Sequence, residues 1–139
     1  MWGKMHKKLA VALTCADWRL HAHKVDLNRR IAGLLHVDGV DLIAVPGPDG
    51  LIKAERKGEW ETAVAQIKLL IGAHSPHALI VLAHQRCAGH PVSDHEHDAD
   101  VAKTAEALKS ATGFAGPVRA AVAVYHSDTA WDLKTIKEF

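Results

Sequence analysis

The chain has 139 residues, of which 48% are hydrophobic, so we expect a single domain spanning residues 1–139 with one hydrophobic core. Its 17 lysine and arginine residues nearly balance 16 aspartate and glutamate residues, and the basic residues are scattered, which disfavours nucleic acid as a partner. No apolar stretch approaches the roughly 20 residues that a membrane span needs, so we expect no membrane partner.

The first element in the chain is an apolar run at residues 9–13 that follows a basic segment at residues 1–8. This order superficially resembles a secretory signal, but the run is too short and stops at the polar residues 14–17. We therefore interpret residues 8–13 as a buried first strand and expect a cytoplasmic protein.

Further short apolar runs follow, separated by longer segments of helical periodicity, which is typical of βαβ units. A helix is predicted from Leu20 onward, because apolar positions recur with helical spacing as far as Leu34. A second helix is predicted from Trp60 to about Gly72, and a third over residues 99–110 with Asp98 or a neighbour as N-cap. Strands are predicted at residues 8–13, 40–45, 78–83 and 118–125, with a short edge strand at 131–136.

These elements predict an α/β fold with an open, mainly parallel sheet of four to five strands flanked by helices. With the strand order two, one, three, four, the first and third strands are neighbours. Cys15 lies just past the first strand, and His84 and Cys87 lie just past the third. Ligands in open parallel sheets bind beyond the carboxyl ends of the strands, so we expect these three side chains to converge.

Two thiolates and one imidazole are ligands that suit zinc. The His-x-x-Cys spacing allows His84 and Cys87 to reach one ion from a single turn, while Cys15 comes from another element. We predict a Zn²⁺ ion held by Cys15, His84 and Cys87. Three protein ligands leave the fourth tetrahedral position open, as a catalytic site requires.

Asp17 and Arg19 stand next to this predicted site in the segment that begins with Cys15. The guanidinium of Arg19 can hold the carboxylate of Asp17 ionised through a bidentate contact. A fixed carboxylate beside a zinc-bound water can accept its hydrogen bond and orient it. An ordinary surface ion pair is the alternative interpretation of these two residues.

The segments Cys15-x-Asp17-x-Arg19 and His84-x-x-Cys87, the latter followed closely by Gly89, resemble the two signature segments of the β-class carbonic anhydrases. The similarity continues through residues 122–125 and 128–129 to Leu133. It implies a fold like that of the β-class enzymes, zinc on Cys15, His84 and Cys87, and Asp17 and Arg19 as the catalytic pair. It also implies reversible hydration of carbon dioxide to bicarbonate by a zinc-bound hydroxide, and a homodimer or higher homo-oligomer.

Two segments depart from that family pattern. The family usually has an arginine and an Ala-Gly-Asn-like turn after its second strand, whereas residues 44–50 here read Ala-Val-Pro-Gly-Pro-Asp-Gly. Arg86 places a cation between two predicted ligands, where it either attracts an anion or points to solvent. A divergent zinc hydrolase of the carbonyl sulfide or carbon disulfide type and a catalytically silent zinc protein therefore stay open, as does Asp17 in the fourth zinc position.

Three other kinds of chemistry compete with a catalytic zinc site. His90, His95 and His97 could relay protons, but we favour a solvated loop before a helix for residues 94–98. Cys15 could act as a reactive thiolate beside Arg19, an interpretation that leaves His84 and Cys87 without a role. A purely structural zinc site normally has four ligands, and a nucleotide site would need a glycine-rich phosphate loop that is absent from the sequence.

Overall fold

A computed structural model describes residues 7–139, so the basic residues 1–6 of the signal-like segment lie outside the described residues. Five strands form one sheet in the order β2-β1-β3-β4-β5. Their bounds are Leu9–Cys15 (β1), Gly39–Val45 (β2), Ala78–His84 (β3), Val118–Ser127 (β4) and Ala130–Glu138 (β5). The first four strands are parallel and β5 runs antiparallel to β4. The predicted open, mainly parallel α/β sheet and its strand order are confirmed.

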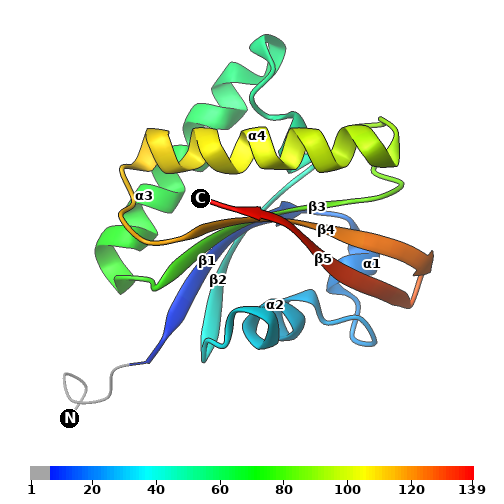
Figure 1. The fold of residues 1–139 in the computed structure, drawn as a ribbon, viewed down its shortest axis with the longest axis horizontal. Coiled ribbons are helices and arrows are strands. Elements are labelled where there is room, and N and C mark those ends of the chain that lie inside the picture. The colour runs from blue at the N-terminus through cyan, green and yellow to red at the C-terminus, as the bar shows by residue number, and fades with distance from the viewer. Residues whose placement is uncertain (1–6) are drawn as a thin grey trace.

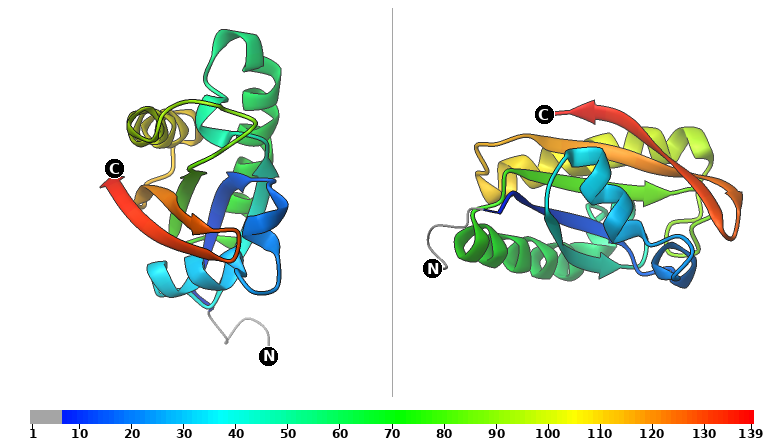
Figure 2. Two further views of the ribbon diagram at one scale, coloured as in Figure 1. Left: turned by 90° about the vertical axis from the view of Figure 1, so that its right-hand side faces the viewer. Right: turned by 90° about the horizontal axis from the view of Figure 1, so that it is seen from below.

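Helices cover both faces of this sheet (Figure 1). The long helices α3 (Lys57–His74) and α4 (Asp94–Thr112) lie on one face, and the short helices α1 (Trp18–His21) and α2 (Leu27–Leu35) lie on the other, as the end-on view in Figure 2 shows. Two single-turn 3₁₀ helices, η2 (Pro48–Gly50) and η3 (Ala54–Arg56), connect β2 to α3. None of the helices in the described part of the chain is long and apolar enough to cross a membrane.

The central strand β3 is buried at all seven positions because it is covered on both faces. Leu79 and Val81 join the cluster under α3 and α4, whereas Ile80 and Leu82 join the cluster over α1 and α2. Alternate residues of a strand point to opposite faces, so His84 continues the series of Ile80 and Leu82. The last residue of β3 is thereby directed toward the face of the sheet that α1 and α2 cover.

The prediction of one continuous helix from Leu20 is wrong, because the structure has two separate helices there, α1 and α2. Ala22 is extended, and Asp26 adopts a left-handed conformation and caps α2 by accepting a hydrogen bond from the N–H of Arg29. Leu20 and Leu27 nevertheless reach the same buried cluster. The apolar residues keep the spacing of one helix, but the carboxylate of Asp26 accepts a hydrogen bond from a free N–H group at the start of α2. A second helix therefore begins after Asp26.

The start of α4 also differs from the prediction, since the helix begins at Asp94 instead of residue 99. The hydroxyl of Ser93 accepts a hydrogen bond from the N–H of Glu96 and donates one to its carboxylate, which forms a strong N-terminal cap. The expected solvated loop is therefore helix. His95 is exposed, but His97 is buried, so the solvated interpretation is wrong for His97. His90, which precedes this segment, is buried as well.

Candidate metal centre

The three predicted zinc ligands meet at the carboxyl edge of the sheet. Cys15 is the last residue of β1 and His84 is the last residue of β3, so both belong to the strands instead of lying past them. Cys87 follows in the loop after β3. The parallel pairing of β1 with β3 brings the two strand ends together. All three side chains are buried, and one donor atom from each lies within 4.8 Å of the other two.

The geometry of this group fits a zinc ion. The two Sγ atoms are 3.8 Å apart, which is about the separation of two sulfurs bound at about 2.3 Å to one tetrahedral zinc. The Nδ1 of His84 lies 2.7 Å from the carbonyl oxygen of Gln85 and donates to it, so the lone pair is on Nε2. That Nε2 is buried and has no hydrogen-bond partner within residues 7–139. A bound cation would satisfy it.

The two cysteines share one proton when no metal is bound. The hydrogen bond from Cys87, aided by His84 and the N–H of Gly47, lowers the pKa of Cys15 to about 4, against the opposing effect of burial. The same hydrogen bond and burial raise the pKa of the Cys87 thiol. Burial lowers the pKa of His84, but the Cys15 thiolate beside it makes the net change an increase. The Cys15 thiolate therefore places a buried negative charge among the three side chains, which favours a cation.

The predicted Asp17–Arg19 ion pair lies beside these three residues. Arg19 donates to Asp17 Oδ1 from its backbone N–H at 2.9 Å and from Nε at 3.1 Å, and to Oδ2 from Nη2 at 2.8 Å. These hydrogen bonds lower the pKa of Asp17 despite its partial burial. Asp17 Oδ2 is 3.9 Å from the unpartnered Nε2 of His84. The carboxylate is thus ionised and close to the ligands.

Arg19 is itself held by the loop after β3 and by residues near the turn between β4 and β5. Its guanidinium donates to the carbonyl of Arg86 at 3.1 Å and to Asp128 at 3.4 Å, and it lies 5.3 Å from the ring centroid of Trp131. The rings of Trp131 and His84 also pack in a T-shaped arrangement, with centroids 5.7 Å apart. Asp128 and Trp131 received no site role from the sequence, because no local spacing connects them to Arg19.

Arg86 has a left-handed backbone (φ 57°), which is uncommon for a residue other than glycine. Its guanidinium lies 4.1 Å from the centroid of the Tyr125 ring, a cation–π contact. This contact directs the exposed side chain over Tyr125, and the carbonyl of the same residue accepts the hydrogen bond from Arg19. Arg86 therefore helps to define the loop that carries Cys87.

A hollow of about 400 Å³ opens beside the centre. It is lined by Cys15, Ala16, Asp17, Trp18, Pro46, Ala88 and Gly89. Asp17 supplies the charged group in this lining, and the remaining walls are apolar or are formed by the Cys15 sulfur and glycine backbone. A small uncharged molecule can therefore approach the ligands and the Asp17 carboxylate from this side.

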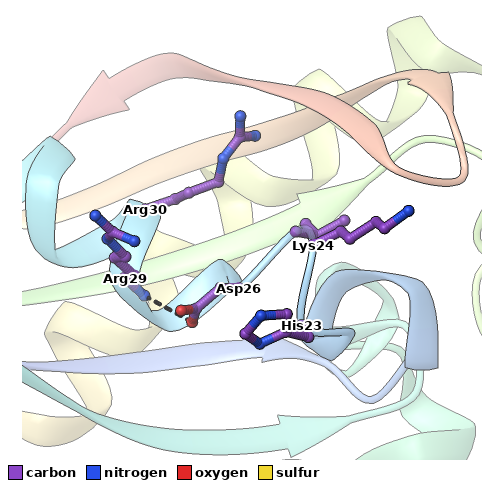
Figure 3. Close-up of a pocket in the computed structure, with 6 residues that line it drawn as sticks. His23, Lys24, Asp26, Arg29 and Arg30 are labelled. Atoms are coloured by element: carbon purple, nitrogen blue, oxygen red, sulfur yellow. Dashed lines mark hydrogen bonds between the residues drawn. The ribbon is translucent and has the colours of Figure 1, made fainter.

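A second hollow of similar volume, about 400 Å³, is basic and lies at the start of α2 (Figure 3). Its lining includes His23, Lys24, Arg29 and Arg30, but the carboxylate of Asp26 also lies in it and caps α2. The guanidinium of Arg30 donates to the carbonyl of Trp131. None of the three predicted zinc ligands lines this hollow, so it is not part of the metal centre.

Sequence reasoning missed a second group of potential ligands, formed by Asp49, His90 and Asp100. One donor atom from each again lies within 4.8 Å of the others. His90 was considered only as a proton relay, and no motif spacing singled out either aspartate. The burial of Asp49 and of His90 emerges only in the folded chain.

No curated protein matches the chain. A family model described as "Putative carbonic anhydrase" matches residues 5–137, which is nearly the entire sequence. The matched region contains the metal centre and the Asp17–Arg19 pair. The chain therefore belongs to this carbonic anhydrase family.

Proposed function

We propose that the protein is a zinc-dependent enzyme that reversibly hydrates carbon dioxide to bicarbonate. The observation that carries the proposal is the convergence of Cys15, His84 and Cys87, with the ionised Asp17 carboxylate 3.9 Å from His84 Nε2. Membership of the carbonic anhydrase family supports the same reaction.

The three converging side chains would hold the metal. Zinc in such a site supplies Lewis acidity, which makes water a nucleophile at neutral pH. The chain supplies the orientation: the carbonyl of Gln85 fixes the tautomer of His84, and the Gly47 N–H contributes a hydrogen bond to the Cys15 sulfur. The sulfurs of Cys15 and Cys87 would supply negative charge to the cation.

Asp17 is proposed as the hydrogen-bond acceptor for the reacting water. Arg19 occupies Oδ1 with two hydrogen bonds and Oδ2 with one, so a free lone pair of Oδ2 is available toward the ligands. Arg19 keeps this carboxylate ionised, so Asp17 can accept a hydrogen bond from a water molecule. That hydrogen bond directs a lone pair of the water oxygen toward the substrate. Arg19 acts through Asp17 as a positioning residue.

The walls of the hollow fit a small uncharged substrate. Trp18, Pro46 and Ala88 supply apolar surface beside Asp17, which suits carbon dioxide. Carbonyl sulfide and carbon disulfide have the same linear shape, and Pro46 belongs to the segment that departs from the family pattern. A hydrolase acting on these two molecules is therefore the second candidate function. Assembly into a homo-oligomer and a cytoplasmic location stay predictions.

Stopped-flow hydration of carbon dioxide by zinc-loaded protein tests the proposal. Asp17→Asn should lower kcat/KM by about 100-fold or more, the range for loss of a proton-accepting group, while the zinc content stays unchanged. Asp94→Asn, which removes an exposed carboxylate from α4, is the matched control and should keep full activity.

A zinc-loaded protein that is no faster than buffer would overturn the anhydrase proposal. Release of sulfide from carbonyl sulfide or carbon disulfide would then support the second candidate. Inactivity toward all three molecules would leave a catalytically silent zinc protein.

A further inference from the structure

Asp49, His90, His97 and Asp100 form a second buried polar cluster on the α4 side of the sheet, distinct from the cysteine centre. Asp49 belongs to η2, His90 to the loop between β3 and α4, and Asp100 to the second turn of α4. Donor atoms of Asp49, His90 and Asp100 lie within 4.8 Å of one another. Three separate segments therefore contribute to one point.

The Asp49 carboxylate is the most unusual group in this cluster because its side chain is 0% exposed. The Nδ1 of His97 lies 2.6 Å from Oδ2, but Oδ1 has no hydrogen-bond partner among the described residues. No lysine or arginine within residues 7–139 forms an ion pair with Asp49 or Asp100. Burying a carboxylate without a compensating cation is strongly unfavourable.

His90 lies between the two carboxylates. Its Nε2 is 2.7 Å from Asp100 Oδ2 and 4.0 Å from Asp49 Oδ2. One N–H can bond Asp100 but cannot also bond Asp49, whose Oδ2 already contacts His97 and whose Oδ1 has no partner among the described residues. A cation among the three donor atoms would instead contact both carboxylates and the Nε2 lone pair of the His90 tautomer that carries its proton on Nδ1.

The surroundings hold these donors in place, as the outer ligands of metal sites do. His97 fixes the Asp49 carboxylate through Oδ2 and so leaves Oδ1 free. The ring of His90 packs so closely on Gly50 that a Cβ there would lie 2.7 Å from Nδ1. The hydroxyl of Thr104 donates to the carbonyl of Asp100 at 2.8 Å and lies 3.4 Å from the carbonyl of Asp49. The segments are thus preorganised around one point.

Two carboxylates and one imidazole, with no sulfur, suit a harder divalent cation than the cysteine centre does. We propose that Asp49, His90 and Asp100 bind a second divalent metal ion of the Mn²⁺ class, with water completing its coordination and His97 orienting Asp49. The half-buried Asp100 gives the ion a path from solvent. The bound ion would fasten η2, the loop after β3 and α4 to one another.

The test titrates zinc-loaded protein with Mn²⁺ and counts bound ions by calorimetry and metal analysis. Mn²⁺ stands low in the order of divalent-metal affinities, so it leaves the zinc–thiolate site occupied. We expect one further equivalent of Mn²⁺ per chain and a rise in Tm that depends on Mn²⁺ concentration. Asp49→Asn and Asp100→Asn should each abolish both effects. Glu106→Gln, which neutralises an exposed carboxylate of the same helix, should bind Mn²⁺ like the parent.

Two results would overturn the site: parent protein that binds no Mn²⁺, or Asn variants that bind it as tightly as the parent. If Asp49→Asn fails to fold, Asp100→Asn decides, because its side chain is 27% exposed and better tolerates substitution. Cys87→Ser should retain the Mn²⁺ equivalent. The outcome is independent of whether the protein hydrates carbon dioxide.

Discussion

The cysteine centre and the aspartate–histidine cluster lie at the same carboxyl edge of the sheet, yet they are built in different ways. Two of the three cysteine-centre residues, Cys15 and His84, are the last residues of adjacent strands. Asp49, His90 and Asp100 come from a 3₁₀ turn, a loop and a helix. Strand pairing alone nearly specifies the first group, whereas the second depends on the packing of α4 over the loops.

The two regions meet where the loops after β2 and β3 cross. Gly47 and Gly89 approach so closely that a Cβ on either would lie 2.6 Å from backbone atoms of the other. Gly47 directs its N–H to the Cys15 sulfur and stands two residues before Asp49, while Gly89 lies between Cys87 and His90. The glycine contact therefore links two donor sets of different chemical character.

The largest expected effect is the loss of zinc from Cys87→Ser, a change that affects the cysteine centre alone. Cys87→Ser replaces a thiolate by a hydroxyl that does not ionise at neutral pH, so zinc should fall from about one per chain to almost none after dialysis. Carbon dioxide hydration should be lost with it. Asp49→Asn is the reciprocal control and should keep its zinc. A Cys87→Ser protein with full zinc, by metal analysis, would remove Cys87 from the ligand set.

Trp131→Ala tests the aromatic wall that only the cysteine centre has. Trp131 is 2% exposed and packs against His84 and Arg19, so truncation should lower the free energy of unfolding by about 3–5 kcal/mol. Zinc affinity should also fall, because the imidazole loses its support. Trp131→Phe should recover most of both losses. Urea unfolding that shows equal stability for the Ala and Phe variants would contradict this role.

The sequence was sufficient to predict the sheet and the cysteine centre because both depend on short-range signals. Short apolar runs separated by helical segments predict the strands. Parallel pairing of the first and third strands then places Cys15 near His84. The interruption between α1 and α2 was missed because Leu20 and Leu27 keep helical spacing while Asp26 restarts the helix. The start of α4 was missed because the Ser93–Glu96 cap was not recognised.

Residues brought together by tertiary packing were the ones that the sequence could not predict. Trp131 contacts Arg19 across most of the chain length, and Asp49 contacts His97 through the packing of η2 against α4. Neither pair has a local motif. His97 stands in the first turn of α4 and is buried where its ring meets Asp49, while its helical neighbours 94–96 are exposed, so the missed helix start also hid this burial.

Gly47→Ala tests the contact that joins the two regions. Gly47 has a φ of 55°, and its Cβ would collide with the backbone of Gly89 and His90. Gly113 has a φ of 68° with no atom within 4 Å of its Cβ position in the described chain, so Gly113→Ala isolates the conformational effect. We expect about 1 kcal/mol of destabilisation for Gly113→Ala and about 2–4 kcal/mol for Gly47→Ala. If urea unfolding shows the same loss of stability for both variants, the two crossing loops can move apart without cost and the contact does not constrain them.

The smallest expected effect belongs to the helix cap on the aspartate–histidine side. Ser93→Ala removes the side-chain acceptor for the Glu96 N–H and should destabilise the protein by about 1 kcal/mol. Ser110→Ala, near the other end of α4 at an exposed position, is the control and should change stability by less than about 0.5 kcal/mol.

Because His97 and Asp100 stand in the first two turns of α4, fraying of this helix end in Ser93→Ala should weaken Mn²⁺ binding modestly while the zinc content stays constant. Zinc loss from Ser93→Ala would instead show that α4 positions the cysteine centre as well, through the loop that carries Cys87.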